Sequence, residues 1–152
     1  MKKLLTALLL ALTISATCFA EGASGRFGAE EKAADALIAA LTGNSLTYDE
    51  VSKSFSQGLK TNLTAENFGK LKGDIRKQVG TIKNVNFVIL NKQYDLQKGY
   101  NGIDELVYFG TAGKEKYARI FISFAMENNV PKVNAFQITP IEPKKTETPA
   151  KK

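Results

Sequence analysis

The stretch KYARIFISFAMENNVPKVNAFQITPI, residues 116–141, decides the fold of this chain. In its first half, apolar residues occupy every second position, namely Ala118, Ile120, Ile122, Phe124 and Met126. A period of two with many β-branched and aromatic side chains predicts a strand. Asn128 and Asn129 follow, and asparagine tolerates the positive φ of a tight hairpin turn. With a second strand over residues 133–139, this stretch is predicted to form a β-hairpin that closes an antiparallel sheet.

The register of the hairpin has two alternatives. If the turn contains only residues 128–129, Phe121 pairs with Phe136 on the outer face of the sheet. If Val130 joins the turn, Phe136 instead lies beside Ile122 in the core. A shift by one residue exchanges the two faces, so the choice decides how apolar the outer face is.

Three segments upstream have apolar residues at helical spacing. The first begins at Ala29 and ends at Gly43, after a loose lead-in over residues 21–27, and Glu30 and Glu31 suit the positive end of its dipole. The second follows a capping box formed by Thr47 and Glu50. The third covers residues 64–80. Their apolar positions are Ala33, Ala34, Leu37, Ile38 and Leu41, then Val51, Phe55 and Leu59, then Phe68, Leu71, Ile75 and Val79.

After Gly80 the apolar period changes to two, which predicts strands over residues 83–92 and 103–111, with a loop over 95–102 between them. Asp104 and Glu105 begin the second of these strands, where a turn or edge role is the simplest interpretation. Helices followed by antiparallel strands indicate an α+β domain over residues 27–141. We expect two to three N-terminal helices packed on one face of a curved four-stranded antiparallel sheet.

The two ends differ from this domain. Lys2 and Lys3, an apolar run over residues 4–14 and small residues up to Ala20 are typical of a secretory signal peptide, residues 1–20, cleaved after Ala20. A run of eleven residues is too short for a stable membrane span, which needs about 20. The protein is therefore predicted to be periplasmic or secreted. Residues 142–152, with two prolines and alternating charges, predict a disordered tail.

Cys18 offers an alternative N-terminus. The segment resembles a bacterial lipoprotein signal, although Thr17 stands where that signal has Gly, Ala or Ser. Lipidation at Cys18 would anchor the protein to a membrane. Cleavage after Ala20 would instead leave a chain without cysteine, and thus without disulfides or thiol chemistry.

Charge and composition exclude several functions. The net charge of +6 comes largely from the ends: without Lys2, Lys3 and the four lysines and two glutamates of residues 142–152, 15 basic and 13 acidic groups remain. A body of net charge +2 gives no electrostatic argument for nucleic-acid binding. The chain has no histidine, which excludes imidazole-based triads and histidine metal sites. We expect no cofactor.

Two stretches resemble the nuclear transport factor 2-like, or cystatin-like, superfamily, specifically its small exported bacterial members of unassigned function. The first is the helical pattern Phe55, Leu59-Lys60, Leu63-Thr64, Phe68, Leu71 and Gly80; the second is VNAFQI, residues 133–138. Pro131-Lys132 stands where many members have a tryptophan and a basic residue. The resemblance implies helices on a curved sheet, a fold that hosts isomerases, dehydratases, binding modules and dimerisation domains.

The leading functional hypothesis is an exported, non-catalytic binding or assembly module that holds a small apolar or amphipathic ligand between helices and sheet. We assign Tyr108, Asn134, Phe68 and Phe87 to such a cavity; Tyr108 and Asn134 also have ordinary structural interpretations. One alternative is a cofactor-free lyase or isomerase that uses Tyr108 and a carboxylate such as Asp104. Another is an inhibitor of a secreted hydrolase that uses the loop over residues 95–102.

The outer face of the sheet predicts a homodimer. Tyr117, Arg119 and Phe121 alternate with the core-facing residues of the third strand, and two of the three are aromatic. An antiparallel sheet with one face in water should alternate more cleanly between apolar and polar residues. A contiguous apolar patch commonly marks an interface.

Overall fold

The computed structural model describes residues 23–43, 45–113 and 116–141. The predicted leader, with Cys18 and Ala20, and the predicted tail over residues 142–152 lie outside the described residues. Signal cleavage, lipidation and tail disorder therefore stay predictions.

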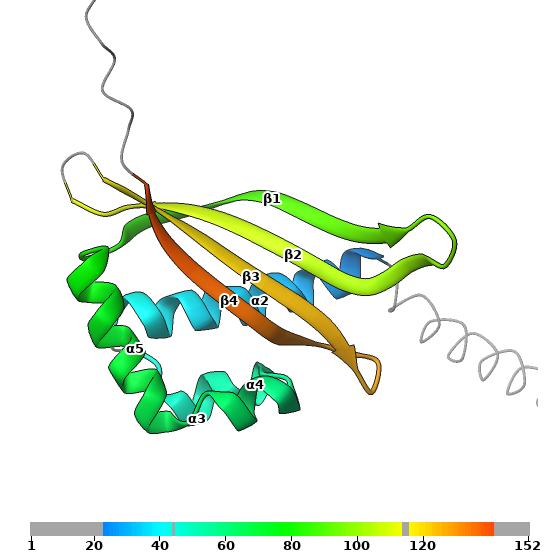
Figure 1. The fold of residues 1–152 in the computed structure, drawn as a ribbon, viewed down its shortest axis with the longest axis horizontal. Coiled ribbons are helices and arrows are strands. Elements are labelled where there is room, and N and C mark those ends of the chain that lie inside the picture. The colour runs from blue at the N-terminus through cyan, green and yellow to red at the C-terminus, as the bar shows by residue number, and fades with distance from the viewer. Residues whose placement is uncertain (1–22, 44, 114–115, 142–152) are drawn as a thin grey trace, which may run out of the picture.

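Helices come first along the chain and strands afterwards, which confirms the α+β prediction (Figure 1). The four strands pair antiparallel in the order β1-β2-β3-β4. The helices lie on one side of the curved sheet, and α2 runs along it. In chain order the elements are α2 (Ala23–Thr42), α3 (Tyr48–Val51), the 3-10 turn η1 (Ser52–Ser54), α4 (Gln57–Asn62), α5 (Ala65–Gln78), β1 (Lys83–Asp95), β2 (Gly99–Thr111), β3 (Tyr117–Glu127) and β4 (Val130–Ile141).

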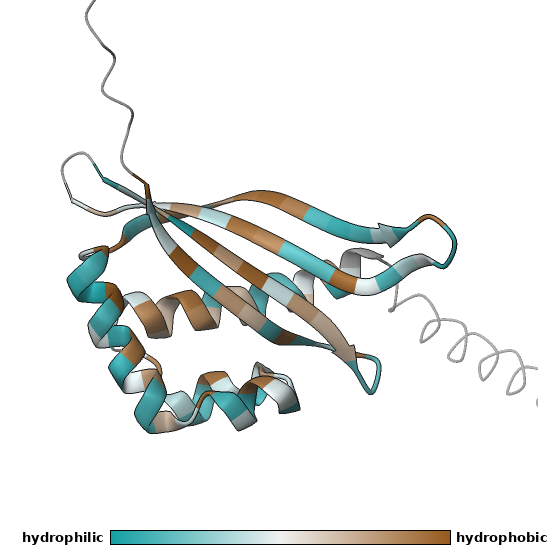
Figure 2. Cartoon of the chain, viewed as in Figure 1, coloured by the Kyte–Doolittle hydropathy of each residue, from teal (hydrophilic) through white to brown (hydrophobic). Residues whose placement is uncertain are grey.

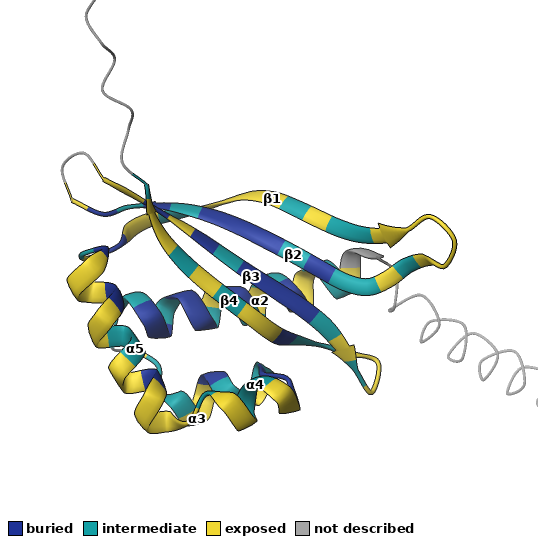
Figure 3. Ribbon diagram, in the orientation of Figure 1, coloured by how far each residue is buried: buried dark blue, intermediate teal, exposed yellow. Residues whose placement is uncertain are grey.

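The core lies between the helices and the inner face of β3. Four alternate side chains of β3 have no exposed surface: Ala118, Ile120, Ile122 and Phe124. The apolar stripes predicted for α2 and α5 cover this face, with Leu37 1% and Phe68 3% exposed. Figure 2 shows the matching alternation of apolar and polar residues along the strands, and Figure 3 shows the buried residues concentrated on β2, β3 and α2. Period-two spacing thus predicted the core residues of β3 correctly up to Phe124, but it was wrong for Met126, which is 38% exposed near the end of the strand.

The register of the last hairpin combines the two alternatives. Asn128 and Asn129 form a two-residue turn with φ of 51° and 63°. Phe136 nevertheless pairs with Ile122 on the core side, and Phe121 pairs with Gln137. A β-bulge is the reason: Val133 pairs with Phe124 and Ala135 with Ser123, so that residue 134 is inserted between them. Since the bulge adds one residue, the strand changes face halfway along its length.

The helical half differs from the prediction at two points. Residues 23–27 belong to α2, so the predicted loose lead-in is wrong for that segment, and Glu30 lies inside a helix rather than in its first turn. The predicted second helix begins after the capping box of Thr47 and Glu50, as expected, but its continuation past Phe55 is wrong. The chain is extended at Phe55, where φ and ψ are −82° and 147°. Phe55 forms a bridge to Val133, and the Ser56 backbone N–H donates to the Val133 carbonyl at 2.8 Å. This contact with the sheet outweighs the helical periodicity.

The first hairpin is longer than predicted. β1 extends to Asp95 and β2 begins at Gly99, so most of the predicted loop over residues 95–102 is strand. The Asp95 Oδ1 atom accepts hydrogen bonds from the backbone N–H groups of Gln97 and Lys98, both at 2.8 Å. Side-chain turns of this kind favour a tight connection, and Gly99 supplies the positive φ of 79° that ends it.

Gly110 on β2 lies where no side chain fits. A Cβ atom there would lie 2.7 Å from Cγ2 of Ile82 and 3.2 Å from the carbonyl oxygen of Lys83. We predict that Gly110→Ala lowers the free energy of unfolding by about 1–3 kcal/mol through overpacking, measured by urea denaturation. Gly69→Ala is the control, because an added Cβ at this α5 position meets nothing within 4 Å. It should raise stability by about 0.5–1 kcal/mol. Equal effects of the two substitutions would contradict the prediction.

Candidate functional site

A hollow lies between β4, the edge strand of the sheet, and the two helices α4 and α5. It has a volume of about 550 Å³ and is open to solvent. We call it the helix–strand pocket. Its apolar lining consists of Leu59, Leu63, Leu71, Ile75, Ala135, Phe136 and Ile138; its polar lining consists of Asn62, Asp74, Gln78, Asn134 and Gln137.

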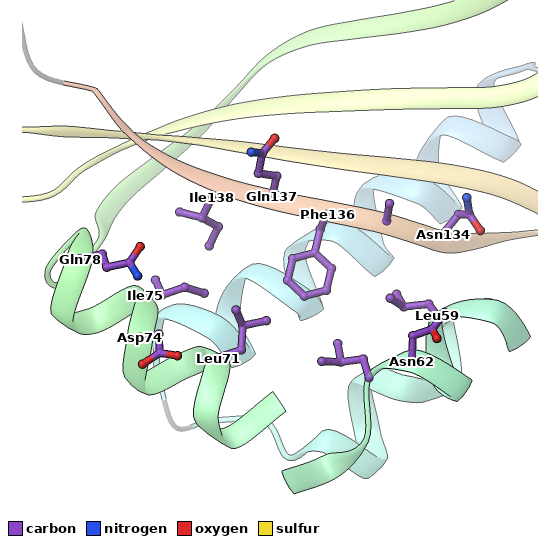
Figure 4. Close-up of a pocket in the computed structure, with 12 residues that line it drawn as sticks. Leu59, Asn62, Leu71, Asp74, Ile75, Gln78, Asn134, Phe136, Gln137 and Ile138 are labelled. Carbon is purple, nitrogen blue, oxygen red and sulfur yellow. The ribbon is translucent and has the colours of Figure 1, made fainter. Parts of the chain in front are cut away.

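The bulge in β4 builds one wall of this pocket. Because the strand changes face at the bulge, Phe136 and Ile138 join the helix side of the sheet. Figure 4 shows both side chains pointing from β4 towards Leu71 and Ile75 of α5. Without the extra residue, Phe136 would lie on the outer face and this wall would be missing.

Asn134, the bulged residue, lies at one end of the pocket. Its Oδ1 atom accepts a hydrogen bond from the Ser56 hydroxyl at 3.3 Å. The Ser56 oxygen in turn accepts from the Leu59 N–H at 3.0 Å, which caps α4. Asn134 therefore joins the bulge to the start of α4, and this chain of hydrogen bonds fixes the spacing between strand and helix.

The other residues assigned to a cavity lie elsewhere. Phe68 is 3% exposed and packs on Tyr48, with ring centroids 5.7 Å apart, so it belongs to the core. Tyr108 and Phe87 contact each other with centroids 5.5 Å apart. They line a second pocket of about 510 Å³ between α2 and the start of β1, together with Glu31 and Asp35. The structure therefore brings Tyr108 and Phe87 together, but places Asn134 and Phe68 apart from them.

Tyr108 is poorly suited to acid–base chemistry. Its hydroxyl is buried and has no hydrogen-bond partner in the described part of the chain. Burial raises the pKa of this phenol well above its ordinary value, and the negative charges of Asp35 and Glu31 raise it further. Asp104 does not meet Tyr108, because its Oδ1 atom accepts instead from the Tyr100 hydroxyl at 2.7 Å.

Asp104 belongs to a buried charge cluster that the sequence pattern did not reveal. The cluster joins Arg26 and Glu30 of α2, Lys92 of β1 and Tyr100 and Asp104 of β2. The Asp104 and Glu30 side chains have no exposed surface. The sequence pattern began this helix at Ala29, which put Glu30 in its first turn. Because α2 begins at Ala23, Glu30 lies inside the helix, where its side chain faces the sheet.

The three residues assigned to a dimer interface share the outer face of β3. Tyr117 is 47% exposed, and Arg119 is exposed with its Cζ atom 5.9 Å from the ring centroid of the half-buried Phe121. Because Phe136 lies on the core side, the outer apolar patch is smaller than it would be with Phe121 and Phe136 paired.

Comparisons with protein-family models, curated proteins and solved structures found no match. The described residues contain no group of three or more acidic, histidine or cysteine side chains that could hold a metal ion. Nor does any helix within these residues have the length and apolar character to cross a membrane.

The unpartnered Tyr108 hydroxyl gives a test of the site geometry. A buried donor without a partner costs about 1–3 kcal/mol, so removing it should be neutral or stabilising. We predict that Tyr108→Phe leaves the free energy of unfolding unchanged or raises it by about 1 kcal/mol, as measured by thermal and urea denaturation.

Tyr100→Phe is the matched control for this substitution. It removes the 2.7 Å hydrogen bond to the Asp104 carboxylate, so a loss of about 1.5–3 kcal/mol is expected. If Tyr108→Phe were as destabilising as Tyr100→Phe, the Tyr108 hydroxyl would have a partner and the described geometry would be contradicted.

Proposed function

We propose that this protein is an exported, non-catalytic binding module that holds a small apolar or amphipathic ligand in the helix–strand pocket. One observation carries the proposal: an open pocket of about 550 Å³ with an apolar interior and polar amides and one carboxylate in its lining. Ligand sites in proteins combine these features, and volumes of about 300–1,000 Å³ are typical. The export part of the proposal rests on residues 1–20 of the sequence.

The geometry of the pocket is consistent with an amphipathic ligand. Leu59, Leu71 and Phe136 are only partly buried, so a ligand would cover apolar surface that water now contacts. Burial of such surface contributes roughly 25 cal/mol per Å². Amide groups on Asn62, Gln78 and Asn134 offer both donors and acceptors to a polar end of the ligand.

Two alternatives receive less support. The lyase or isomerase needs Tyr108 and a carboxylate within hydrogen-bond reach of each other. The Tyr108 hydroxyl has no hydrogen-bond partner among the described residues, and the bonds of Asp104 go to Tyr100 and Lys92. The hydrolase inhibitor needs a shaped exposed loop. Residues 95–102 instead form a tight hairpin tip, although Leu96 is fully exposed there.

Leucine substitutions test binding in the pocket. We predict that the fluorescent apolar amine N-phenyl-1-naphthylamine binds the wild type, and that Leu71→Gln weakens its binding about tenfold, the equivalent of about 1.4 kcal/mol. Leu96→Gln is the matched control, since the same change at the hairpin tip lies outside the pocket and should leave the Kd unchanged. Circular dichroism establishes that both variants are folded. Equal probe affinity of folded Leu71→Gln and the wild type would contradict the proposal.

We also propose that the outer face of the sheet pairs with a second copy of the chain. This second proposal rests on large apolar side chains on that face: Ile89 is 49% exposed, Tyr117 is 47% exposed, and the half-buried Phe121 pairs with Val107, which in turn pairs with Ile89. Sheet faces with such patches commonly form interfaces.

A charge at the centre of this patch should prevent pairing. We predict a dimer for the wild type and a folded monomer for Phe121→Glu, measured by multi-angle light scattering at high micromolar concentration. Gln137→Glu, on the neighbouring residue of β4, is the control for added charge without loss of the ring. A wild type that is monomeric at this concentration would exclude the dimer.

A further inference from the structure

The buried charge cluster connects three elements through a small set of contacts. The Arg26 Nε atom lies 2.8 Å from Oε1 of Glu30 and 3.1 Å from Oδ2 of Asp104. Lys92 Nζ lies 3.0 Å from the same Asp104 oxygen, and the Tyr100 hydroxyl donates to the other oxygen at 2.7 Å. The cluster therefore holds two cations, on Arg26 and Lys92, and two carboxyl groups, on Glu30 of α2 and on Asp104 of β2.

The protein supplies different numbers of hydrogen-bond donors to the two carboxyl groups. Asp104 receives hydrogen bonds or ion pairs from three donor groups, on Arg26, Lys92 and Tyr100. Glu30 receives one, from Arg26, and its Oε2 atom is buried without a partner among the described residues. Neither carboxyl side chain has exposed surface, so both groups are removed from bulk solvent.

An ionised carboxylate oxygen that is buried without a donor is costly, and two carboxylates close together disfavour double ionisation. A proton on Glu30 resolves both problems, because it neutralises the unpartnered group and provides a donor for Asp104. The two carboxyl groups are neighbours, because both lie against the Arg26 Nε atom, at 2.8 Å and 3.1 Å. Asp104, with its three donors, is the better site for the negative charge.

We propose that Glu30 and Asp104 form a proton-binding pair, in which Glu30 keeps a proton that exposed carboxyl groups have lost and thereby holds α2 against the β1–β2 hairpin. A neutral Glu30 leaves Arg26 and Lys92 to neutralise Asp104. This pair is separate from the helix–strand pocket and does not depend on the function proposed for it.

The pKa directions agree with the geometry. Burial raises the pKa of Glu30, and the charge of Asp104 raises it further against the opposing hydrogen bond from Arg26. Burial would also raise the pKa of Asp104, but hydrogen bonds from Tyr100 and Lys92 more than offset this and lower it. Because the two carboxyl groups share the Arg26 guanidinium, they titrate as a pair, and Glu30 dominates the step at higher pH.

The position of the pair gives this proton a structural consequence. Arg26 also donates to the Gly102 carbonyl at 2.9 Å and lies over the Tyr100 ring, with Cζ 5.0 Å from its centroid. Near its N-terminal end, α2 thus contacts β2 through the polar and charged groups of Arg26, Asp104 and Gly102. Figure 1 shows this end of α2 beneath the β1–β2 hairpin. When Glu30 loses its proton, a second buried negative charge enters this contact and weakens it.

The sign of the pH dependence follows from linkage. Between the ordinary glutamate pKa of 4.5 and the raised pKa of Glu30, the folded protein holds a proton that the unfolded chain has released. The stability contributed by Glu30 is therefore complete below this window and falls as the pH rises through it. Asp104 acts in the opposite direction, because its lowered pKa contributes stability that is lost only in strong acid.

Urea unfolding from pH 4.5 to 8.5 tests the pair with Glu30→Gln. Glutamine has the shape and the donor of the protonated acid, so this variant should remove the decline with pH above 4.5. Unfolding of the wild type releases one proton within this window. The equilibrium constant for folding therefore falls by up to tenfold for each unit that the pH rises. The control is Glu31→Gln on the adjacent, more exposed residue, which should keep the wild-type pH profile. Parallel profiles of Glu30→Gln and the wild type would overturn the proposal.

A second measurement does not depend on the stability of any variant. Carbon-detected NMR of side-chain carboxyl groups in the wild type should show Glu30 titrating above all exposed glutamates. Asp104→Asn should move the Glu30 midpoint downward, because the neighbouring charge is gone. A wild-type Glu30 that titrates at or below 4.5 would overturn the proposal.

Discussion

The buried inner face of β3 is the constraint on which the rest of the structure depends. Ala118, Ile120, Ile122 and Phe124 have no exposed surface, and both neighbouring strands and α2 are placed by the need to cover them. Burial of apolar surface is the dominant favourable contribution to folding. At the edge of the sheet the cover is incomplete, because α4 and α5 leave β4 partly uncovered. The helix–strand pocket is the space that remains beside β4.

A single inserted residue connects this core to the pocket. Asn134 shifts the register of β4, so that Val133 faces the core beside Phe124 and Phe136 faces it beside Ile122. The same region holds the break between η1 and α4, because Val133 bridges to Phe55. Bulges often occur where a strand must redirect side chains towards a site. Here the bulge, the helix break and the pocket wall are parts of one arrangement.

Periodicity predicted the fold class, the order of helices and strands, the asparagine turn and the inner face of β3, because these features depend on local pattern. The pattern could not predict the break at Phe55, which follows from a hydrogen bond to Val133, a residue distant in the chain. It also missed the cluster around Asp104, since Arg26 and Glu30 were placed outside or at the start of a helix that begins at Ala23. Because of the bulge, each register alternative is correct for part of β4: the two-residue turn holds up to Val133, and the shifted register holds from Ala135 onwards.

The proposed binding function is tested most directly by two-dimensional NMR of the labelled protein titrated with N-phenyl-1-naphthylamine. Binding in the helix–strand pocket predicts saturable shifts confined to the backbone amides of β4 from Asn134 to Ile138 and of α4 and α5. The strand β1 and the outer-face residues Tyr117 and Arg119 should not respond. Absence of saturable shifts, or shifts restricted to the outer face of the sheet, would contradict the account.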